Sequence, residues 1–219
     1  MFSLEVKPKN LKEMSVPKLI DVTPFEPLII KTHYNNFDFK KLEPTLNELI
    51  DGVPFKTHLE IGDANSSATN INKQPHIMSE FADFYKWLEP IVEHILYNEW
   101  GLYDKIDYKP SNSWVNFHGD GGETGLHHHG ATALTIAAYI QMPDDGGYIQ
   151  FKDPMEYQKG FHTRKFDDEK WMWKTVPAIT GDVILFPGWI RHKTHPNKNK
   201  NVKRWVLTTN YMHLYGKSK

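Results

Sequence analysis

The stretch TGDVILFPGWIRH, residues 180–192, combines a turn, an apolar strand and a histidine. A Gly-Asp turn leads into the apolar run VILF, which is typical of a strand buried on both faces. The Pro-Gly pair ends this strand, so His192 follows just beyond it, where a rigid sheet can aim a side chain at a metal ion. A single histidine in such a place is more often a surface or helix-end residue. The stretch therefore predicts a sheet protein and makes His192 a candidate ligand that needs partners.

Short β-type runs separated by Gly, Asp and Pro fill the chain from about residue 111 onwards. The five predicted strands are Ser113–Phe117, Ala133–Ile140, Gly147–Phe151, Asp182–Phe186 and Arg204–Asn210. No helical pattern alternates with them, which favours an antiparallel sandwich or jelly roll over a βαβ fold. We therefore expect a mainly β fold with flanking helices, a cupin-like double-stranded β-helix over residues 111–213.

The part of the chain before this core, residues 1–110, predicts a helical support for it. Apolar spacing indicates one helix over Phe39–Ile50 and a longer one over Ser79–Trp100. We expect Ser79 to cap the longer helix and Pro90 to kink it. Both helices would pack on one outer face of the sheet.

Two further N-terminal segments lack a regular pattern. Small polar residues make 58–72 a predicted loop, and the prolines among residues 1–30 favour edge strands or an extended arm. We expect the whole chain, 1–219, to form one domain.

The composition excludes several classes of function. The chain has no cysteine and 12 histidines, so a metal ion would need imidazole and oxygen ligands. With 26 Lys plus Arg against 27 Asp plus Glu, nothing in the net charge of -1 indicates nucleic acid as a partner. No apolar run approaches the roughly 20 residues of a membrane span, and the N-terminal sequence lacks a signal-peptide pattern. We expect a cytoplasmic protein with no membrane partner.

The strongest local signal is GLHHHG, residues 125–130. In an extended chain alternate side chains share a face, so His127 and His129 point one way and His128 the other. The alternative is a solvated polar loop. Together with His192, however, the pair has the layout of a mononuclear metal site in a double-stranded β-helix.

Arg204 opens the last predicted strand. Strand alternation places Arg204, Val206, Thr208 and Asn210 on one face. A guanidinium on an inner face is costly unless it meets a carboxylate, so a bound dicarboxylate is a suitable partner. The alternative is an exposed arginine that continues the lysine-rich turn before it.

The ordered set of these segments resembles the Fe(II)- and 2-oxoglutarate-dependent oxygenase superfamily, in particular small bacterial and phage proteins related to the prolyl-4-hydroxylase-like oxygenases. The matching pieces are Trp114-Val115-Asn116, His127-His128-His129 with Thr135 and Tyr139, Gly147–Pro154, Gly181–His192, and Arg204–Asn210. They follow the family's order over about residues 111–212.

The resemblance implies a facial triad on Fe(II), which most of the superfamily builds from His-x-Asp/Glu and a distal His. By position, His127 is the first ligand and His192 the distal one, while His129 stands where a carboxylate is usual. We predict a three-histidine site, with Asp120 or Glu123 as alternative oxygen donors. A halogenase-like reading, in which halide fills a position beside His129-Gly130-Ala131, would leave His127 unexplained.

The resemblance also implies a pocket for 2-oxoglutarate, with Arg204 paired to its distal carboxylate. The family often places Ser or Thr two residues beyond the arginine, where this chain has a valine. Thr208, Thr135 or Tyr139 would then complete the site, and Asn116 is a candidate second contact.

The activity implied is that of a dioxygenase, commonly a hydroxylase, that couples decarboxylation of 2-oxoglutarate to succinate with C–H oxidation of a small molecule or protein side chain. No catalytic residue is expected beyond the metal ligands. The aromatic and charged segment 155–176 is predicted to be a lid over the iron or a packed surface excursion. Two other functions remain open: a cupin-type three-histidine enzyme without 2-oxoglutarate, and a non-enzymatic jelly-roll binding or structural module.

Overall fold

The computed structural model describes residues 29–102, 107–156 and 172–213. Its largest element is a six-stranded antiparallel sheet. In spatial order the strands are β1 (Ile30–His33), β9 (Asp182–Pro187), β6 (Leu134–Gln141), β11 (Arg204–His213), β4 (Tyr108–His118) and β3 (Ala64–Ser66). The predicted strands all lie within or overlap strands of the structure, and the mainly β fold is confirmed.

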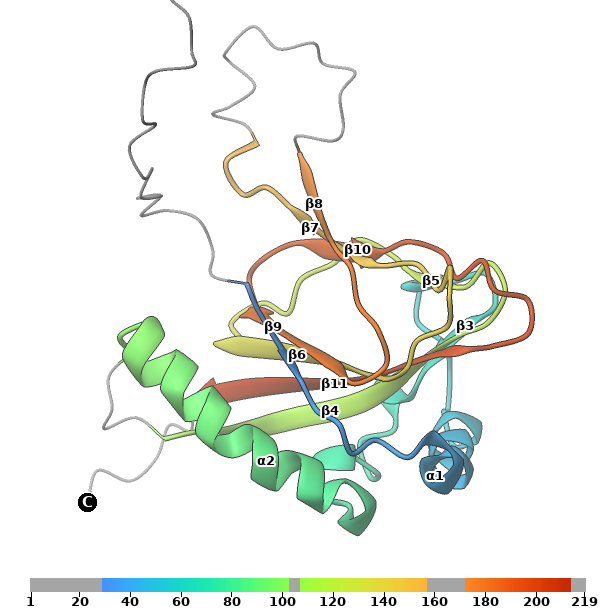
Figure 1. The fold of residues 1–219 in the computed structure, drawn as a ribbon, viewed down its shortest axis with the longest axis horizontal. Coiled ribbons are helices and arrows are strands. Elements are labelled where there is room, and N and C mark those ends of the chain that lie inside the picture. The colour runs from blue at the N-terminus through green and yellow to red at the C-terminus, as the bar shows by residue number, and fades with distance from the viewer. Residues whose placement is uncertain (1–28, 103–106, 157–171, 214–219) are drawn as a thin grey trace, which may run out of the picture.

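A smaller sheet faces the central part of the large one (Figure 1). It consists of β10 (His192–Thr194), β7 (Ile149–Lys152) and β8 (Trp173–Val176), again antiparallel. A two-stranded ribbon of β2 (Glu60–Ile61) and β5 (Glu123–Thr124) lies beside β10, where the Thr124 N–H donates to Thr194 Oγ1. The two layers form the double-stranded β-helix that the sequence predicted.

Alternate residues of strand β6 pack on opposite faces of the large sheet. Ile136 and Ala138 belong to the core beneath the helices, whereas Ala137 and Tyr139 belong to the core between the sheets. This alternation explains why the strand reads as a continuous apolar run, because both of its faces are covered. The space between the sheets can therefore hold a site that is shielded from water.

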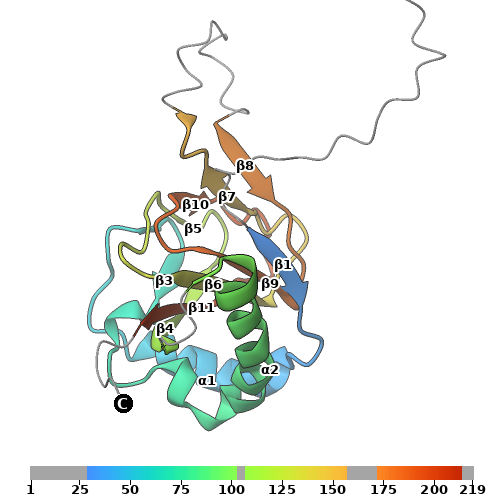
Figure 2. The ribbon, with the colours of Figure 1, turned by 90° about the vertical axis from the view of Figure 1, so that its left-hand side faces the viewer.

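Two helices cover the outer face of the large sheet (Figures 1 and 2). Helix α1 (Phe39–Asp51) is capped by the Asp38 side chain and ends at Gly52, close to the prediction. Helix α2 (Ala82–Glu93) contains Pro90 and contributes buried residues to the same core. Three-residue 3-10 turns at Ser67–Thr69, Pro75–Ile77 and Ser79–Phe81 precede it.

The prediction of one regular helix over 79–100 is wrong, because the helical segment is not regular. Its start is a 3-10 turn, and its last part, His94–Glu99, is a π-helix. Ser79 does not cap α2, since its hydroxyl donates to Glu80 instead. Pro90 has no N–H to donate, and the wider π-type turns follow one turn later.

The predicted loop over 58–72 is also partly wrong, because β2, β3 and a 3-10 turn lie within it. Its polar residues pair with the end of β4 and with β5, which local sequence cannot reveal. Most of the arm predicted over residues 1–30 lies outside the described residues. The division into support and core stays a prediction, and β1 and β3 of the first part join the core sheet.

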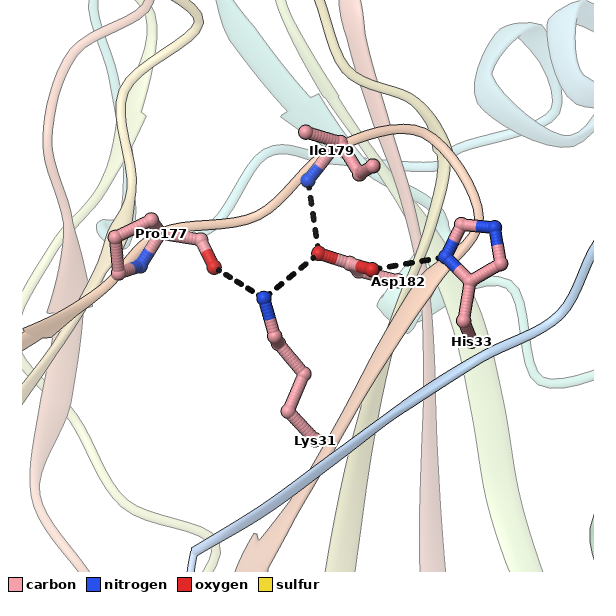
Figure 3. Close-up of polar contacts among 5 residues, drawn as sticks. All are labelled: Lys31, His33, Pro177, Ile179 and Asp182. Atoms are coloured by element: carbon pink, nitrogen blue, oxygen red, sulfur yellow. Dashed lines mark hydrogen bonds and ion pairs between the residues drawn. The ribbon is translucent and has the colours of Figure 1, made fainter.

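The side-chain contacts between β1 and β9 centre on one carboxylate, that of Asp182 (Figure 3). Asp182 accepts hydrogen bonds from His33 Nδ1 (2.9 Å), Lys31 Nζ (3.2 Å) and the Ile179 backbone N–H (3.0 Å). Burial alone would raise the pKa of Asp182, but these hydrogen bonds outweigh it and lower the pKa below its usual value. Gly181 before it has φ +91°, and a Cβ there would meet the His33 ring at 2.7 Å, so the turn requires glycine.

No helix in the described ranges is both long enough and apolar enough to cross a membrane. The cytoplasmic location stays a prediction.

Candidate metal centre

The three predicted histidines come together at one end of the space between the sheets. His192 begins β10, and its backbone exchanges two hydrogen bonds with His127, N to O at 2.9 and 3.0 Å. His129 is held through its own N–H, which donates to Gly188 O at 2.7 Å. One nitrogen from each ring lies within 4.8 Å of the other two, and no other group of this kind occurs among the described residues.

Backbone carbonyls orient two of the rings. His127 Nδ1 lies 2.8 Å from Gly125 O, and His192 Nδ1 lies 3.0 Å from Ile190 O. A carbonyl only accepts, so both Nδ1 atoms carry the proton and both Nε2 atoms keep a free lone pair. This tautomer is the one that a metal ion requires.

Burial keeps the rings uncharged. It is the main cause that lowers the pKa of His127 and, more strongly, that of His192. It also lowers the pKa of His129 to about 3, with a smaller contribution from the neighbouring histidines. Neutral imidazoles repel each other little and are the form that binds metal.

Two of the three donors have close to the spacing that one ion requires. His129 Nε2 and His192 Nε2 lie 3.3 Å apart. Two nitrogens that bind one ion at about 2.1 Å and at right angles lie roughly 3 Å apart. Asp120 is exposed and Glu123 half-buried, and neither joins the cluster in the described part of the chain. The structure thus gathers three imidazoles and no carboxylate.

A cavity leads from the histidines between the two sheets. The predicted residues Asn116, Tyr139 and Thr208 line it. Asn116 Nδ2 donates to Thr208 Oγ1 at 2.8 Å. Thr135 does not belong to the described lining, because its hydroxyl is buried and donates to Asn210 Oδ1 at 2.9 Å.

Arg204 is fully buried beside this cavity, and its guanidinium meets protein acceptors. Nη1 donates to three backbone carbonyls, those of Gly146, Gly147 and His195. Burial lowers the pKa of Arg204 to about 10, so the side chain stays charged at neutral pH. Gly147 has φ +73°, and a Cβ there would lie 2.9 Å from Arg204 Nη1, so glycine makes room for this arrangement.

Three polar side chains that the sequence did not single out connect Arg204 to the cavity. Arg204 Nε donates to His118 Nδ1 (3.3 Å) and Nη2 donates to Thr194 Oγ1 (2.9 Å). His118 Nε2 lies 2.7 Å from Thr124 Oγ1, and the Thr124 N–H donates to Thr194 Oγ1. All three line the cavity.

A signal existed for two of them. His118 continues the alternation of Trp114 and Asn116 along β4, and Thr194 lies two residues after His192 on the same face. Thr124 carries no such signal. Most of the predicted lid over 155–176 lies outside the described residues, and its role stays a prediction.

The fold and site define a class of protein: a double-stranded β-helix with a cluster of three histidines that could hold one metal ion and a buried arginine next to it. Comparisons with known proteins narrow the class. A family model described as a 2OG-Fe(II) oxygenase matches residues 112–210, which span the core from β4 to β11. No curated protein sequence matches the chain.

Several solved structures share the fold. The carbocyclase SnoK from nogalamycin biosynthesis has a TM-score of 0.57 at 14% identity, with 84% of this chain and 79% of that chain covered. A Pseudomonas putida prolyl-4-hydroxylase has a TM-score of 0.55 at 13% identity, covering 85% and 92%. HygX from Streptomyces hygroscopicus, with nickel and 2-oxoglutarate bound, has a TM-score of 0.54 at 10% identity, covering 85% and 83%.

The core of the chain, residues 112–210, matches the 2OG-Fe(II) oxygenase family, and the solved structures show that the fold is shared. The match identifies an oxidoreductase core of the kind that uses Fe(II), 2-oxoglutarate and dioxygen. This match favours the oxygenase over the cupin-type and non-enzymatic functions that the sequence left open. A bacterial or phage origin stays a prediction.

Proposed function

We propose that the protein is a hydroxylase within this superfamily, with His127, His129 and His192 as the iron ligands. The observation that carries the proposal is the cluster of three uncharged imidazoles beside a cavity wall rich in hydrogen-bond donors. When bound, Fe(II) with 2-oxoglutarate and dioxygen supplies the oxidation of a substrate C–H bond and yields succinate and carbon dioxide. The protein holds the reactants in place and excludes water.

The donor wall is suited to the distal carboxylate of 2-oxoglutarate. His118 accepts from Arg204 at Nδ1, so its Nε2 carries the proton and donates to Thr124 Oγ1. The hydroxyl protons of Thr124 and Thr194 are then free to donate into the cavity. One N–H of Arg204 Nη2 likewise has no acceptor among the described residues.

These three donors make a carboxylate site in which Arg204 supplies the charge from behind the threonines. Such charge-assisted hydrogen bonds are about twice as strong as neutral ones. Val206, two residues beyond the arginine, is therefore no obstacle, since Thr194 and Thr124 provide hydroxyls from other strands. Asn116, Tyr139 and Thr208 line the rest of the cavity and would contact the remainder of the molecule.

The experiment is anaerobic addition of Fe(II) and then 2-oxoglutarate to the metal-free protein, followed by absorption spectroscopy. We expect a metal-to-ligand charge-transfer band for the native protein. The band should be lost in His192→Ala and should need much more 2-oxoglutarate in Arg204→Ala. His128→Ala is the matched control, because His128 is an exposed neighbour outside the cluster. No band with the native protein would contradict the proposal.

Hydroxylation itself needs a product. Turnover under ¹⁸O₂ with an extract fractionated for compounds that stimulate succinate formation should transfer one labelled oxygen atom to the product. A product without added oxygen would contradict hydroxylation and leave the superfamily assignment intact.

A further inference from the structure

The small sheet turns one face toward the large sheet, and its pairing shows which side chains lie on that face. Directly paired residues of antiparallel strands share a face, as do residues two apart in one strand. Val176 of β8 packs against the core between the sheets. Lys174, two residues earlier, therefore lies on the same inner face.

Lys174 belongs to the same cross-strand row as a proposed iron ligand. It pairs with Phe151 of β7, and Phe151 pairs with His192 of β10. The Phe151 ring lies 6.0 Å from the His192 ring, centroid to centroid. Two steps of about 4.8 Å between strands place the Lys174 backbone roughly 10 Å from that of His192.

The charge of Lys174 is unmatched within the described ranges. It is exposed, and within the described ranges no hydrogen bond or ion pair involves it. The sheet's other lysines are engaged on the opposite face: Lys152 pairs with Glu156 at 2.8 Å, and Lys193 lies 4.4 Å from the Trp173 ring centroid.

The remaining inward positions of this sheet are apolar or belong to the site already described. They are Ile149, Phe151, Val176, His192 and Thr194. Lys174 is thus the one unpaired cation on the inner face of the described sheet, at the level of the metal centre. A flexible ammonium in this position is a suitable partner for an oxyanion that enters beside the iron.

We propose that Lys174 binds an oxyanion group, a carboxylate or phosphate, of the primary substrate. The substrate is then an anionic molecule whose charged group lies on the order of 10 Å from the metal when the reacting carbon is next to it. This inference rests on the proposed function and adds the substrate's chemical class to it.

The test uses the protein loaded with Mn(II), a paramagnetic substitute for Fe(II), and 2-oxoglutarate. The probes are inorganic phosphate, followed by ³¹P relaxation, and acetate, followed by relaxation of its methyl protons. Paramagnetic relaxation detects weak ligands in fast exchange and reports their distance from the ion. We expect an enhancement for at least one probe that corresponds to a separation on the order of 10 Å.

Lys174→Gln should reduce this enhancement about tenfold, the usual effect of losing a hydrogen bond to a charged group. Lys174→Arg should keep it. Lys193→Gln is the matched control, because it removes the same charge from the opposite face. The two probes distinguish a phosphate from a carboxylate preference.

The inference is overturned if neither probe is relaxed in the native protein, if Lys174→Gln and Lys193→Gln behave alike, or if the distance shows a probe bound directly to the ion. The Fe(II) charge-transfer band of the native protein distinguishes a failure of the proposed function from a failure of the role of Lys174. A missing band contradicts the proposed function, whereas a normal band with unaltered relaxation in Lys174→Gln contradicts the role of Lys174 alone.

Discussion

Among the proposed iron ligands, His129 is the one that departs from the usual triad of the superfamily. Its ring is stacked on that of His192, with centroids 5.1 Å apart and planes at 12°, and lies 5.6 Å from the Trp114 ring. The side chain is thus held by aromatic neighbours, and its donor atom points at the same place as that of His192. The carboxylate of a side chain at position 129 would occupy the same space.

We expect His129→Asp to keep Fe(II) binding, because it restores the common two-histidine, one-carboxylate set. His129→Ala should weaken binding by more than about tenfold, since even residues that only orient ligands have effects of that size. Anaerobic calorimetric titration with Fe(II) measures both. Unchanged binding in His129→Ala would show that the ion uses another donor.

Thr194 accepts hydrogen bonds from Arg204 and from the Thr124 backbone, which leaves its own proton for a ligand. Thr194→Val should raise the dissociation constant for 2-oxoglutarate by roughly 10-fold or more, because a hydrogen bond to a charged group is lost. Thr194→Ser keeps the hydroxyl and should bind nearly as the native protein does. Titration of the charge-transfer band gives these constants, and equal affinity of the two variants would exclude Thr194 from the carboxylate site.

The sequence allowed the histidines and the arginine to be singled out because strand alternation is a local property. It correctly placed Arg204, Val206 and Thr208 on one inner face. The partners of Arg204 depend on the register that puts His118 opposite it and on a carbonyl cradle from two other loops. Register and loop packing are set by tertiary contacts, so these partners could not be predicted.

At the scale of elements, strand β1 depends on a single carboxylate for its side-chain contacts with β9 and the turn before it. Asp182→Ala would remove the partly buried hydrogen bond from the Ile179 N–H and release Lys31 and His33. We expect a loss of about 1–3 kcal/mol in the free energy of unfolding. Lys31→Met should cost less, at most about 1 kcal/mol, because the Lys31 side chain is 46% exposed and its ion pair is screened by water.

Urea denaturation measures both values. If Asp182→Ala were no less stable than Lys31→Met, the Asp182 carboxylate would not be what holds β1, and the turn before β9 would hold it instead.

Element boundaries show where local sequence is a weak guide. The apolar spacing of residues 79–100 correctly indicated one packed helical segment, yet three kinds of helical turn occur in it. The short strands β2, β3 and β5 exist only because they pair with one another or with β4. Two or three residues carry too little pattern to be predicted.

At the scale of the whole molecule, buried neutral histidines link stability to pH. Burial and the nearby Arg204 hold the pKa of His118 well below its usual value. In the unfolded chain a histidine has a pKa of about 6.5. As the pH falls below that value the unfolded state gains protons that folded His118 does not accept, so the folded state loses stability.

We therefore expect the free energy of unfolding of the metal-free protein to be highest above about pH 7 and to fall toward pH 5, by up to about 1.4 kcal/mol per pH unit for each such histidine. His118→Gln removes one titrating group and should have a shallower slope, whereas the exposed His128→Gln should not change it. Urea denaturation at several pH values measures the slopes. Equal slopes for His118→Gln and the native protein would contradict this account.

The paired backbone hydrogen bonds between His127 and His192 join two segments far apart in the chain. The pairing of the strands offsets the entropic cost of closing the long loop between these segments. The two segments that carry the proposed ligands are joined by backbone pairing, so we expect metal binding to leave the circular dichroism spectrum of the fold unchanged. Folding and metal binding would then be separate events, and the iron content of the folded protein would follow the supply of iron.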